Sequence, residues 1–214
     1  MTKNIYLLNI ENYAPEITAI TYPAIEAYAE KIGALLIYIT ERKHPDMPPV
    51  YEKLQLYQLA KANPADWHIY IDSDCLLHSD TPDFTVMFEP GVYQPNSDPA
   101  HIRFNLERPD GRDIGTCNWF TVFHNDCLEL FNPDIGLSAA EIYERCTPTE
   151  EEAALFDRTH LIDDFILSTN LAKHGFPYRN GFNMFFHHEY LITREQKAEN
   201  LRKAAAVFST FPGK

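Results

Sequence analysis

Two aspartates directly after an apolar run are the residues of this chain best suited to chemistry. Asp72 and Asp74 flank Ser73 and follow Trp67–Ile71, whose β-branched and aromatic residues predict a buried strand. Because side chains alternate along an extended backbone, we expect both carboxylates to point to the same side and converge on one cation. Carboxylate oxygens suit hard cations, so the pair predicts a Mg²⁺ or Mn²⁺ site. The alternative interpretation is that acidic turn residues merely end the strand.

The residues before this pair predict a parallel sheet that would carry it. Ile5–Ile10 and Leu35–Ile39 are apolar runs of strand length, and the helical pattern between them closes at Gly33. A strand, a helix and a strand in this order form a βαβ unit. A further helix is expected over Tyr51–Ala62, ahead of the acidic pair. We therefore expect a Rossmann-type α/β fold with a mixed, mostly parallel central sheet flanked by helices, and ligands at the carboxyl ends of its strands.

After the acidic pair, the pattern predicts further strands and helices. Strands are expected at Gly91–Gln94 and Trp119–Phe123, with a polar loop or short hairpin over Asn96–Gly115 between them. The expected helices cover Asp126–Phe131, Ser138–Arg145, Thr149–Phe156, Leu161–His174 and Thr193–Phe208.

Length and charge limit the classes of function. The 214 residues are expected to form a single domain, and the net charge of −13 argues against nucleic acid or an anionic membrane as a partner. The first apolar run is too short for a signal peptide or a membrane span, so we expect a soluble, cytoplasmic protein without a membrane anchor. The four cysteines lack CxxC spacing and are expected to be free thiols.

The order of these features resembles the nucleotide-sugar-dependent glycosyltransferases of the GT-A fold, with Asp72-Ser73-Asp74 as the DxD motif. The resemblance covers most of the chain and is closest to the glycosyltransferase 8 type. It implies a nucleotide-binding half over 1–80 and an acceptor and sugar half over 81–214. It also implies transfer of a hexose from a nucleotide diphosphate sugar, with a UDP-hexose as the expected donor, to an unknown hydroxyl acceptor. In such enzymes Mn²⁺ or Mg²⁺ on the acidic pair offsets the charge of the departing diphosphate.

A histidine pair is a candidate source of a third metal ligand. His187 and His188 follow the apolar run Met184–Phe186, and this position resembles the C-terminal histidine of glycosyltransferase 8 metal sites. Because neighbouring residues of a strand face opposite sides, at most one of them is expected to reach the metal, and we slightly favour His187. The alternative is a pair of hydrogen-bonded surface histidines.

Three further residues are candidates for the reaction itself. The resemblance places Asp163 and Asp164 near the acceptor and the reacting carbon, where one carboxylate could be the base of an inverting reaction. In a retaining reaction, the same carboxylate would position donor or acceptor hydroxyls. The alternative is an acidic first turn that complements a helix dipole. Asn118 lies in a segment, Gly115–Phe123, that resembles the strand lining the donor sugar, and its amide can donate and accept hydrogen bonds.

Donor-binding residues are expected at the ends of the first two strands. Asn9, Ile10 and Tyr13 follow the first strand, and Tyr13 could stack on the base. The chain has neither a GxGxxG nor a P-loop pattern, so phosphates would need a metal and basic side chains. Lys53 resembles a helix lysine of related enzymes, although a single lysine on an amphipathic helix is more often exposed. Ser73, as part of the DxD motif, completes the donor-binding candidates.

Two other classes of function share these residues. The segment IYIDSDCLL also resembles the first motif of haloacid dehalogenase-type phosphatases, in which one aspartate is a nucleophile and the next but one an acid or base. That motif belongs on the first strand of its domain, whereas here a βαβ unit and a helix precede it. A non-catalytic protein that binds sugar nucleotides would need the same residues, so only turnover separates it from an enzyme.

Overall fold

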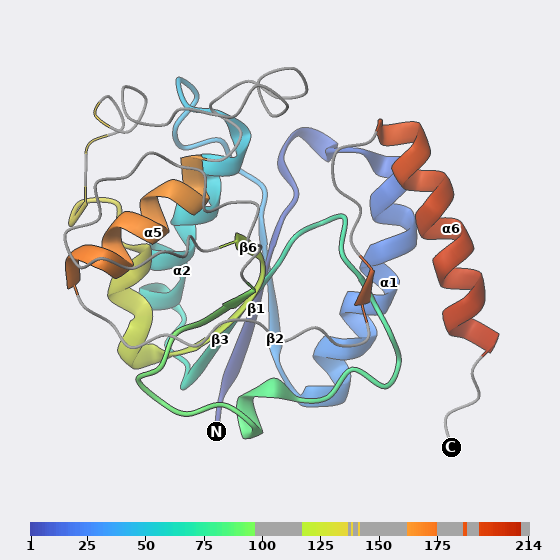
Figure 1. The fold of residues 1–214 in the computed structure, drawn as a ribbon, viewed down its shortest axis with the longest axis horizontal. Coiled ribbons are helices and arrows are strands. Elements are labelled where there is room, and N and C mark those ends of the chain that lie inside the picture. Colours follow the sequence, from blue (N-terminus) through green and yellow to red (C-terminus); the bar gives the residue numbers. More distant parts are fainter. Residues whose placement is uncertain are drawn as a thin grey trace.

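A five-stranded sheet lies at the centre of the computed structural model, in the order β2-β1-β3-β6-β5 (Figure 1). Its strands are β1 (Lys3–Leu8), β2 (Leu35–Ile39), β3 (Trp67–Ile71), β5 (Gln94–Asn96) and β6 (Cys117–His124). β1 is parallel to both β2 and β3, whereas β6 is antiparallel to β3 and β5. This mixed sheet flanked by helices confirms the predicted fold class. The structure describes residues 1–96, 117–136, 138, 141, 162–174, 186–187 and 193–210.

Helices cover both faces of the sheet. α1 (Pro15–Ile32) and α6 (Arg194–Thr210) lie on one side, and α2 (Gln55–Ala62) and α5 (Ile162–His174) lie on the other (Figure 1). Short 3₁₀ segments complete the connections: η1 (Ile10–Asn12), η2 (Pro49–Leu54), η3 (Phe84–Val86) and η5 (Asn125–Phe131). A separate antiparallel pair joins β4 (Leu76–Leu77) to β7 (Phe186–His187).

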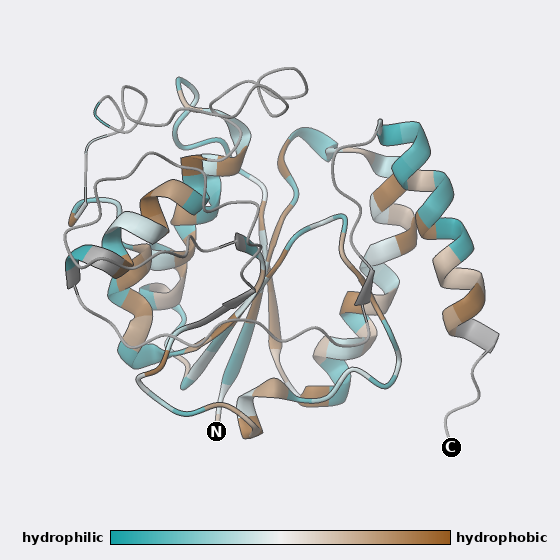
Figure 2. Cartoon of the chain, in the orientation of Figure 1, coloured by the Kyte–Doolittle hydropathy of each residue, from teal (hydrophilic) through white to brown (hydrophobic). Residues whose placement is uncertain are grey.

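The alternation of side chains along β1 and β3 divides the core between the two faces. Ile5, Leu7 and Ile69 pack with the α1 layer, whereas Tyr6 and Tyr70 pack with the α2 and α5 layer. Each of these side chains is at most 1% exposed, and burying an aliphatic one of this size stabilises the fold by about 1.5–3 kcal/mol. The hydropathy colouring in Figure 2 shows apolar residues on the strands and along the helices that flank them.

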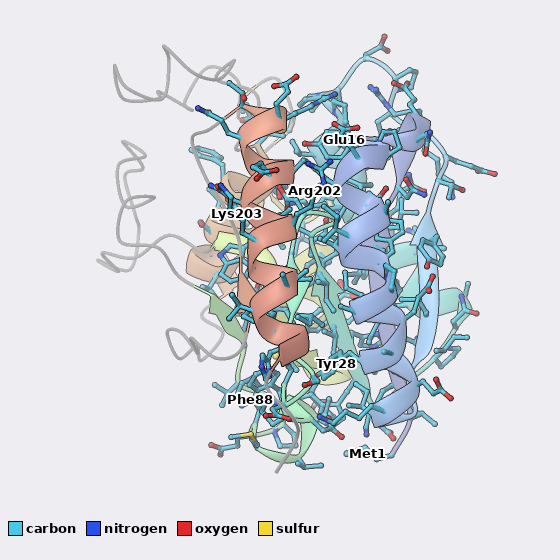
Figure 3. The ribbon with its side chains drawn as sticks, turned by 90° about the vertical axis from the view of Figure 1, so that its right-hand side faces the viewer. Met1, Glu16, Tyr28, Phe88, Arg202 and Lys203 are labelled. Atoms are coloured by element: carbon cyan, nitrogen blue, oxygen red, sulfur yellow. The ribbon has the colours of Figure 1, made fainter. Side chains whose placement is uncertain are left out.

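The last helix, α6, packs on α1 rather than on the sheet. Figure 3 shows the two helices side by side, with Arg202 and Lys203 on α6 and Glu16 near the beginning of α1. A small apolar cluster joins them and includes Ala14, Ile17, Leu76, Ala198 and Leu201. Because α6 begins at the end of the molecule where β1 finishes, its first turn lies at the carboxyl edge of the sheet (Figure 1).

Several boundaries differ from the sequence-based expectations. The expected helix Tyr51–Ala62 is divided: a 3₁₀ segment starts at Pro49, and α2 begins only at Gln55. β5 begins at Gln94 instead of Gly91, because Gly91 adopts φ +77° in a turn. The expected helix Asp126–Phe131 is the 3₁₀ segment η5. The helix expected over Thr149–Phe156 and nearly all of the loop Asn96–Gly115 and the helix Ser138–Arg145 lie outside the described residues.

Two findings concern the composition-based expectations. Within the described ranges, no helix is both long and apolar enough to cross a bilayer. Cys75 and Cys127 are buried free thiols, as their spacing predicted.

Candidate active site

The acidic motif after β3 is a β-turn and not an extended segment. The Cys75 amide donates to the Asp72 carbonyl oxygen at 3.0 Å. Ser73 faces the protein interior, where its carbonyl accepts from Thr21 Oγ1 at 2.5 Å and its hydroxyl donates to the Leu8 carbonyl. The segment is therefore not extended, so strand alternation does not describe how Asp72 and Asp74 are placed. The turn instead gives each carboxylate a partner from a different helical layer.

Asp72 faces the layer formed by α2 and α5. It lies two residues after Tyr70 on the same face of the sheet, and Tyr70 Oη donates to Asp72 Oδ1 at 2.7 Å. Lys53 Nζ lies 3.0 Å from Asp72 Oδ1 and 5.2 Å from the centroid of the Tyr70 ring. Burial and the neighbouring Asp72 charge raise the pKa of Tyr70 well above its ordinary value, so its hydroxyl remains a donor.

Lys53 bridges Asp72 and a second carboxylate. Its Nζ lies 2.9 Å from Asp163 Oδ2, on the first turn of α5. Burial opposes the charge of Lys53, but the carboxylates of Asp163 and Asp72 outweigh it and hold the pKa of Lys53 well above its ordinary value. The residue is only 8% exposed, so the alternative of a solvent-exposed lysine on an amphipathic helix is wrong. The ammonium group is a fixed positive charge at the centre of the site.

A buried glutamate fixes the segment that carries Lys53. Glu52 accepts hydrogen bonds from the His44 amide at 2.7 Å and from Gln55 Nε2 at 2.7 Å. Arg42 Nε lies 3.6 Å from the same carboxylate. Burial opposes ionisation of Glu52, yet the hydrogen bonds from His44 and Gln55 lower its pKa below the ordinary value. η2 is thus tied to the loop that follows β2, which limits where Lys53 can reach.

Asp164 belongs to a second polar network behind the bridge. Its Oδ1 accepts from the backbone amide of Asn118 at 2.8 Å and from Asn118 Nδ2 at 2.7 Å. Tyr93 Oη donates to Asn118 Oδ1 at 2.6 Å, which fixes the orientation of that amide. Burial and the Asp163 carboxylate raise the pKa of Asp164 well above its ordinary value. The structure thus brings the three predicted residues Asn118, Asp163 and Asp164 together.

Asp74 has its partner on α6. Lys197 Nζ lies 2.5 Å from Asp74 Oδ2, and both side chains are largely buried, at 14% and 13% exposed. Sequence reasoning missed Lys197, although a signal exists: a lysine in the first turn of a helix opposes the helix dipole and is favoured there only by a nearby anion. Tyr93 was also missed, since nothing in its sequence context distinguishes it from a core tyrosine.

The loop between β1 and α1 brings the predicted donor residues to the same edge. The Tyr13 ring lies 4.8 Å from the guanidinium carbon of Arg194, at the start of α6. Burial and the Asp74 charge raise the pKa of Tyr13. The backbone N–H of Asn9 donates a hydrogen bond to the Ile39 carbonyl oxygen at 2.9 Å. Ile10 is only 4% exposed and belongs to the interior.

The backbone of this loop is strained on both sides of Tyr13. Glu11, Asn12 and Ala14 have positive φ values of 55°, 53° and 43°, and none of them is a glycine. Left-handed backbone costs about 1–2 kcal/mol per ordinary residue and persists where the surroundings impose it, which is common at ligand sites. The strain supports the assignment of this loop to the candidate site.

The histidine candidates are only partly covered. His187 on β7 is the register partner of Leu76 on β4, and Leu76 comes two residues after Asp74. His188 lies outside the described residues. Among the described side chains, no group of three or more His, Cys, Asp and Glu residues is arranged to hold a metal ion. Asp72 and Asp74 nevertheless fit a hard cation of the Mg²⁺ type, which proteins commonly bind through two carboxylates with substrate phosphates as further ligands.

Comparison with solved structures shows a likeness in fold. No protein-family model matches the chain, and no curated protein does. Among solved structures, the chain is similar to the crystal structure of a glycosyltransferase involved in the glycosylation of the major capsid of PBCV-1. The TM-score is 0.58 at 12% sequence identity, and the match covers 95% of this chain and 100% of the other. The chain therefore has the α/β fold of a glycosyltransferase, consistent with the GT-A-like class.

Proposed function

We propose that this protein is a glycosyltransferase that moves a hexose from a nucleotide diphosphate sugar, with UDP-hexose as the expected donor, to a hydroxyl acceptor. The observation that carries the proposal is the gathering of Asp72, Asp74 and Asp163 around buried lysines at the carboxyl edge of the sheet. This is the edge at which open α/β folds bind ligands. The fold shared with the PBCV-1 glycosyltransferase supports the same class of chemistry.

Asp72 and Asp74 are the residues that would hold Mn²⁺ or Mg²⁺. When bound, the cation would offset the negative charge that develops on the departing nucleoside diphosphate. Both carboxylates are paired with lysine ammonium groups in this structure, which supports a site for positive charge at each of them.

The remaining residues have roles that follow from their contacts. Lys53 holds Asp72 and Asp163 in fixed positions and adds positive charge beside the expected diphosphate. Burial and the Asp163 carboxylate raise the pKa of Asp164, and both N–H groups of Asn118 hold its Oδ1 in place. We infer that Asp164 and Asn118 position the donor sugar.

Thermal unfolding with added nucleotides tests this proposal. UDP, GDP, ADP and TDP would each be added with Mn²⁺ or with EDTA. A ligand at a hundred times its Kd stabilises the folded state by about 2.7 kcal/mol, a rise of roughly 5–11 °C in Tm for a chain of this size. We expect one nucleoside diphosphate to give this rise only with the metal.

Two matched variants define the outcome of that experiment. Asp74→Asn should abolish the metal-dependent rise and keep the fold, whereas Asp80→Asn, at an aspartate that is 56% exposed, should leave it intact. Release of nucleoside diphosphate from the sugar nucleotide then distinguishes an enzyme from a binding protein. No rise with any nucleotide, together with a rise with phosphate and Mg²⁺, would instead indicate a phosphatase.

A further inference from the structure

The first turn of α6 places a lysine at the carboxylate that the metal would use. We propose that Lys197 occupies the cation position on Asp74 in the absence of ligand, gives way to the divalent cation, and then binds the diphosphate of the donor. The inference rests on the proposed role of Asp74 as a metal ligand.

The contact between Lys197 and Asp74 is the first support. Lys197 Nζ lies 2.5 Å from Asp74 Oδ2, so the ammonium group contacts one of the oxygens that a cation would need. Both side chains are largely buried, at 14% and 13% exposed, which weakens screening by solvent. A divalent cation on the same carboxylate would lie close to the ammonium group, and the two positive charges would repel each other.

The position of α6 is the second support. The helix is anchored to α1 through Ala198 and Leu201, which are 2% and 0% exposed. Ala198 is the neighbour of Lys197, so the backbone of the first turn is fixed while the long lysine side chain can change partner. A displaced Lys197 would therefore stay at the carboxyl edge of the sheet, beside the acidic motif.

The charges around Tyr13 are the third support. Arg194 lies over the Tyr13 ring at 4.8 Å, and the charges of Asp74, Lys197, Arg194 and Asp72 all influence the pKa of the Tyr13 hydroxyl. A metal and a diphosphate that enter together add little net charge there, whereas a diphosphate alone adds negative charge beside two carboxylates. Lys197, once displaced from Asp74, would supply a cation for the incoming diphosphate. The exchange predicts weak binding of the metal alone and strong binding of the metal with a diphosphate.

Metal binding to the full-length, nucleotide-free protein tests the exchange directly. Mn²⁺ affinity would be measured by calorimetry for wild type, Lys197→Met, Lys197→Arg and the matched control Lys203→Met, whose side chain is 71% exposed on the same helix. We expect Lys197→Met to bind Mn²⁺ about tenfold more tightly than wild type, because the Lys197 ammonium group no longer competes with the cation for Asp74. With Mn²⁺ present, the same variant should bind inorganic pyrophosphate about tenfold more weakly. Lys197→Arg, which keeps the charge, and Lys203→Met should resemble wild type more closely.

The outcomes separate this inference from the proposed function. If Mn²⁺ binds wild type but not Asp74→Asn, while Lys197→Met shows unchanged or weaker Mn²⁺ binding, the metal site stands and the exchange is refuted. If Mn²⁺ binds neither wild type nor Lys197→Met, both proposals are refuted. If Lys197→Met does not fold, the exchange can be tested on the wild-type protein by NMR. Titration of wild type with Mg²⁺ should shift the signal of the Lys197 ammonium group more than that of Lys203, and equal shifts would refute the exchange.

Discussion

Replacement of Lys53 by methionine is the most direct test of the electrostatic bridge in the site. The ammonium group lies 3.0 Å from Asp72 and 2.9 Å from Asp163, and the lysine side chain is 10% exposed. Removing one partner of a buried ion pair leaves uncompensated charge and costs about 3–5 kcal/mol. At about 2–4 °C per kcal/mol for a chain of this size, we expect Tm to fall by roughly 6–20 °C.

Urea denaturation followed by circular dichroism would measure the effect in a double-mutant cycle. The cycle compares Lys53→Met, Asp163→Asn and the double variant, and we expect a coupling energy of about 1.5–3 kcal/mol between the two positions. The loss in Lys53→Met should shrink at acidic pH, because protonation removes the carboxylate charges that lack a partner. Lys61→Met is the matched control on α2, since its lysine is 51% exposed and should matter little.

Two results would refute this reasoning. A loss below about 1 kcal/mol in Lys53→Met would show that the bridge is no stronger than a surface ion pair. An equal loss from Lys53→Met in the wild-type and Asp163→Asn backgrounds would show that the two groups do not interact.

Three further predictions concern buried polar groups. The pKa of Asp164 lies above its ordinary 3.8, so the folded state binds more protons than the unfolded state and the free energy of unfolding should fall as pH rises above 3.8. Asp164→Asn should remove this pH dependence in urea titrations, and an unchanged dependence would contradict the assignment. Tyr93→Phe loses the 2.6 Å hydrogen bond to Asn118 and should cost about 1–3 kcal/mol in the same assay, whereas a neutral result would mean that the amide finds another donor. Burial lowers the pKa of His68 below its ordinary 6.5, so stability should decline as pH falls below 6.5. His68→Gln should flatten that part of the Tm profile between about pH 5 and pH 7, and a profile that keeps its decline would point to another group.

The sheet and its acidic edge could be predicted because their signals are local. The apolar run of β3 ends at Asp72, and the βαβ pattern places the ends of three parallel strands together. Asp163 and Asp164 begin a helix whose start was expected within one residue of the observed Ile162. Periodicity and strand order are enough for these features.

The partners of the acidic residues could not be predicted, because they are set by packing between distant segments. The sequence pattern around Lys53 predicts a solvent-exposed side chain, yet Glu52 and its hydrogen bonds hold the segment so that Lys53 is buried. Strand alternation does not describe the acidic motif, because the chain turns there and the Ser73 hydroxyl bonds to the Leu8 carbonyl. Lys197 carried only the indirect signal of a cation in the first turn of a helix.

The pairing of Asp74 with Lys197 also sets an order for the maturation of the protein on the ribosome. The two residues are 123 positions apart, so Asp74 leaves the exit tunnel long before its cation is synthesised. Translation at about 5–20 residues per second puts roughly 6–25 s between the two events. During that interval the nascent chain carries the carboxylate in the turn after β3 without α6, and a chain arrested before Arg194 never receives the helix. The site is therefore completed only after Lys197 has been synthesised, which delays ligand binding until the strands that precede α6 have had time to form.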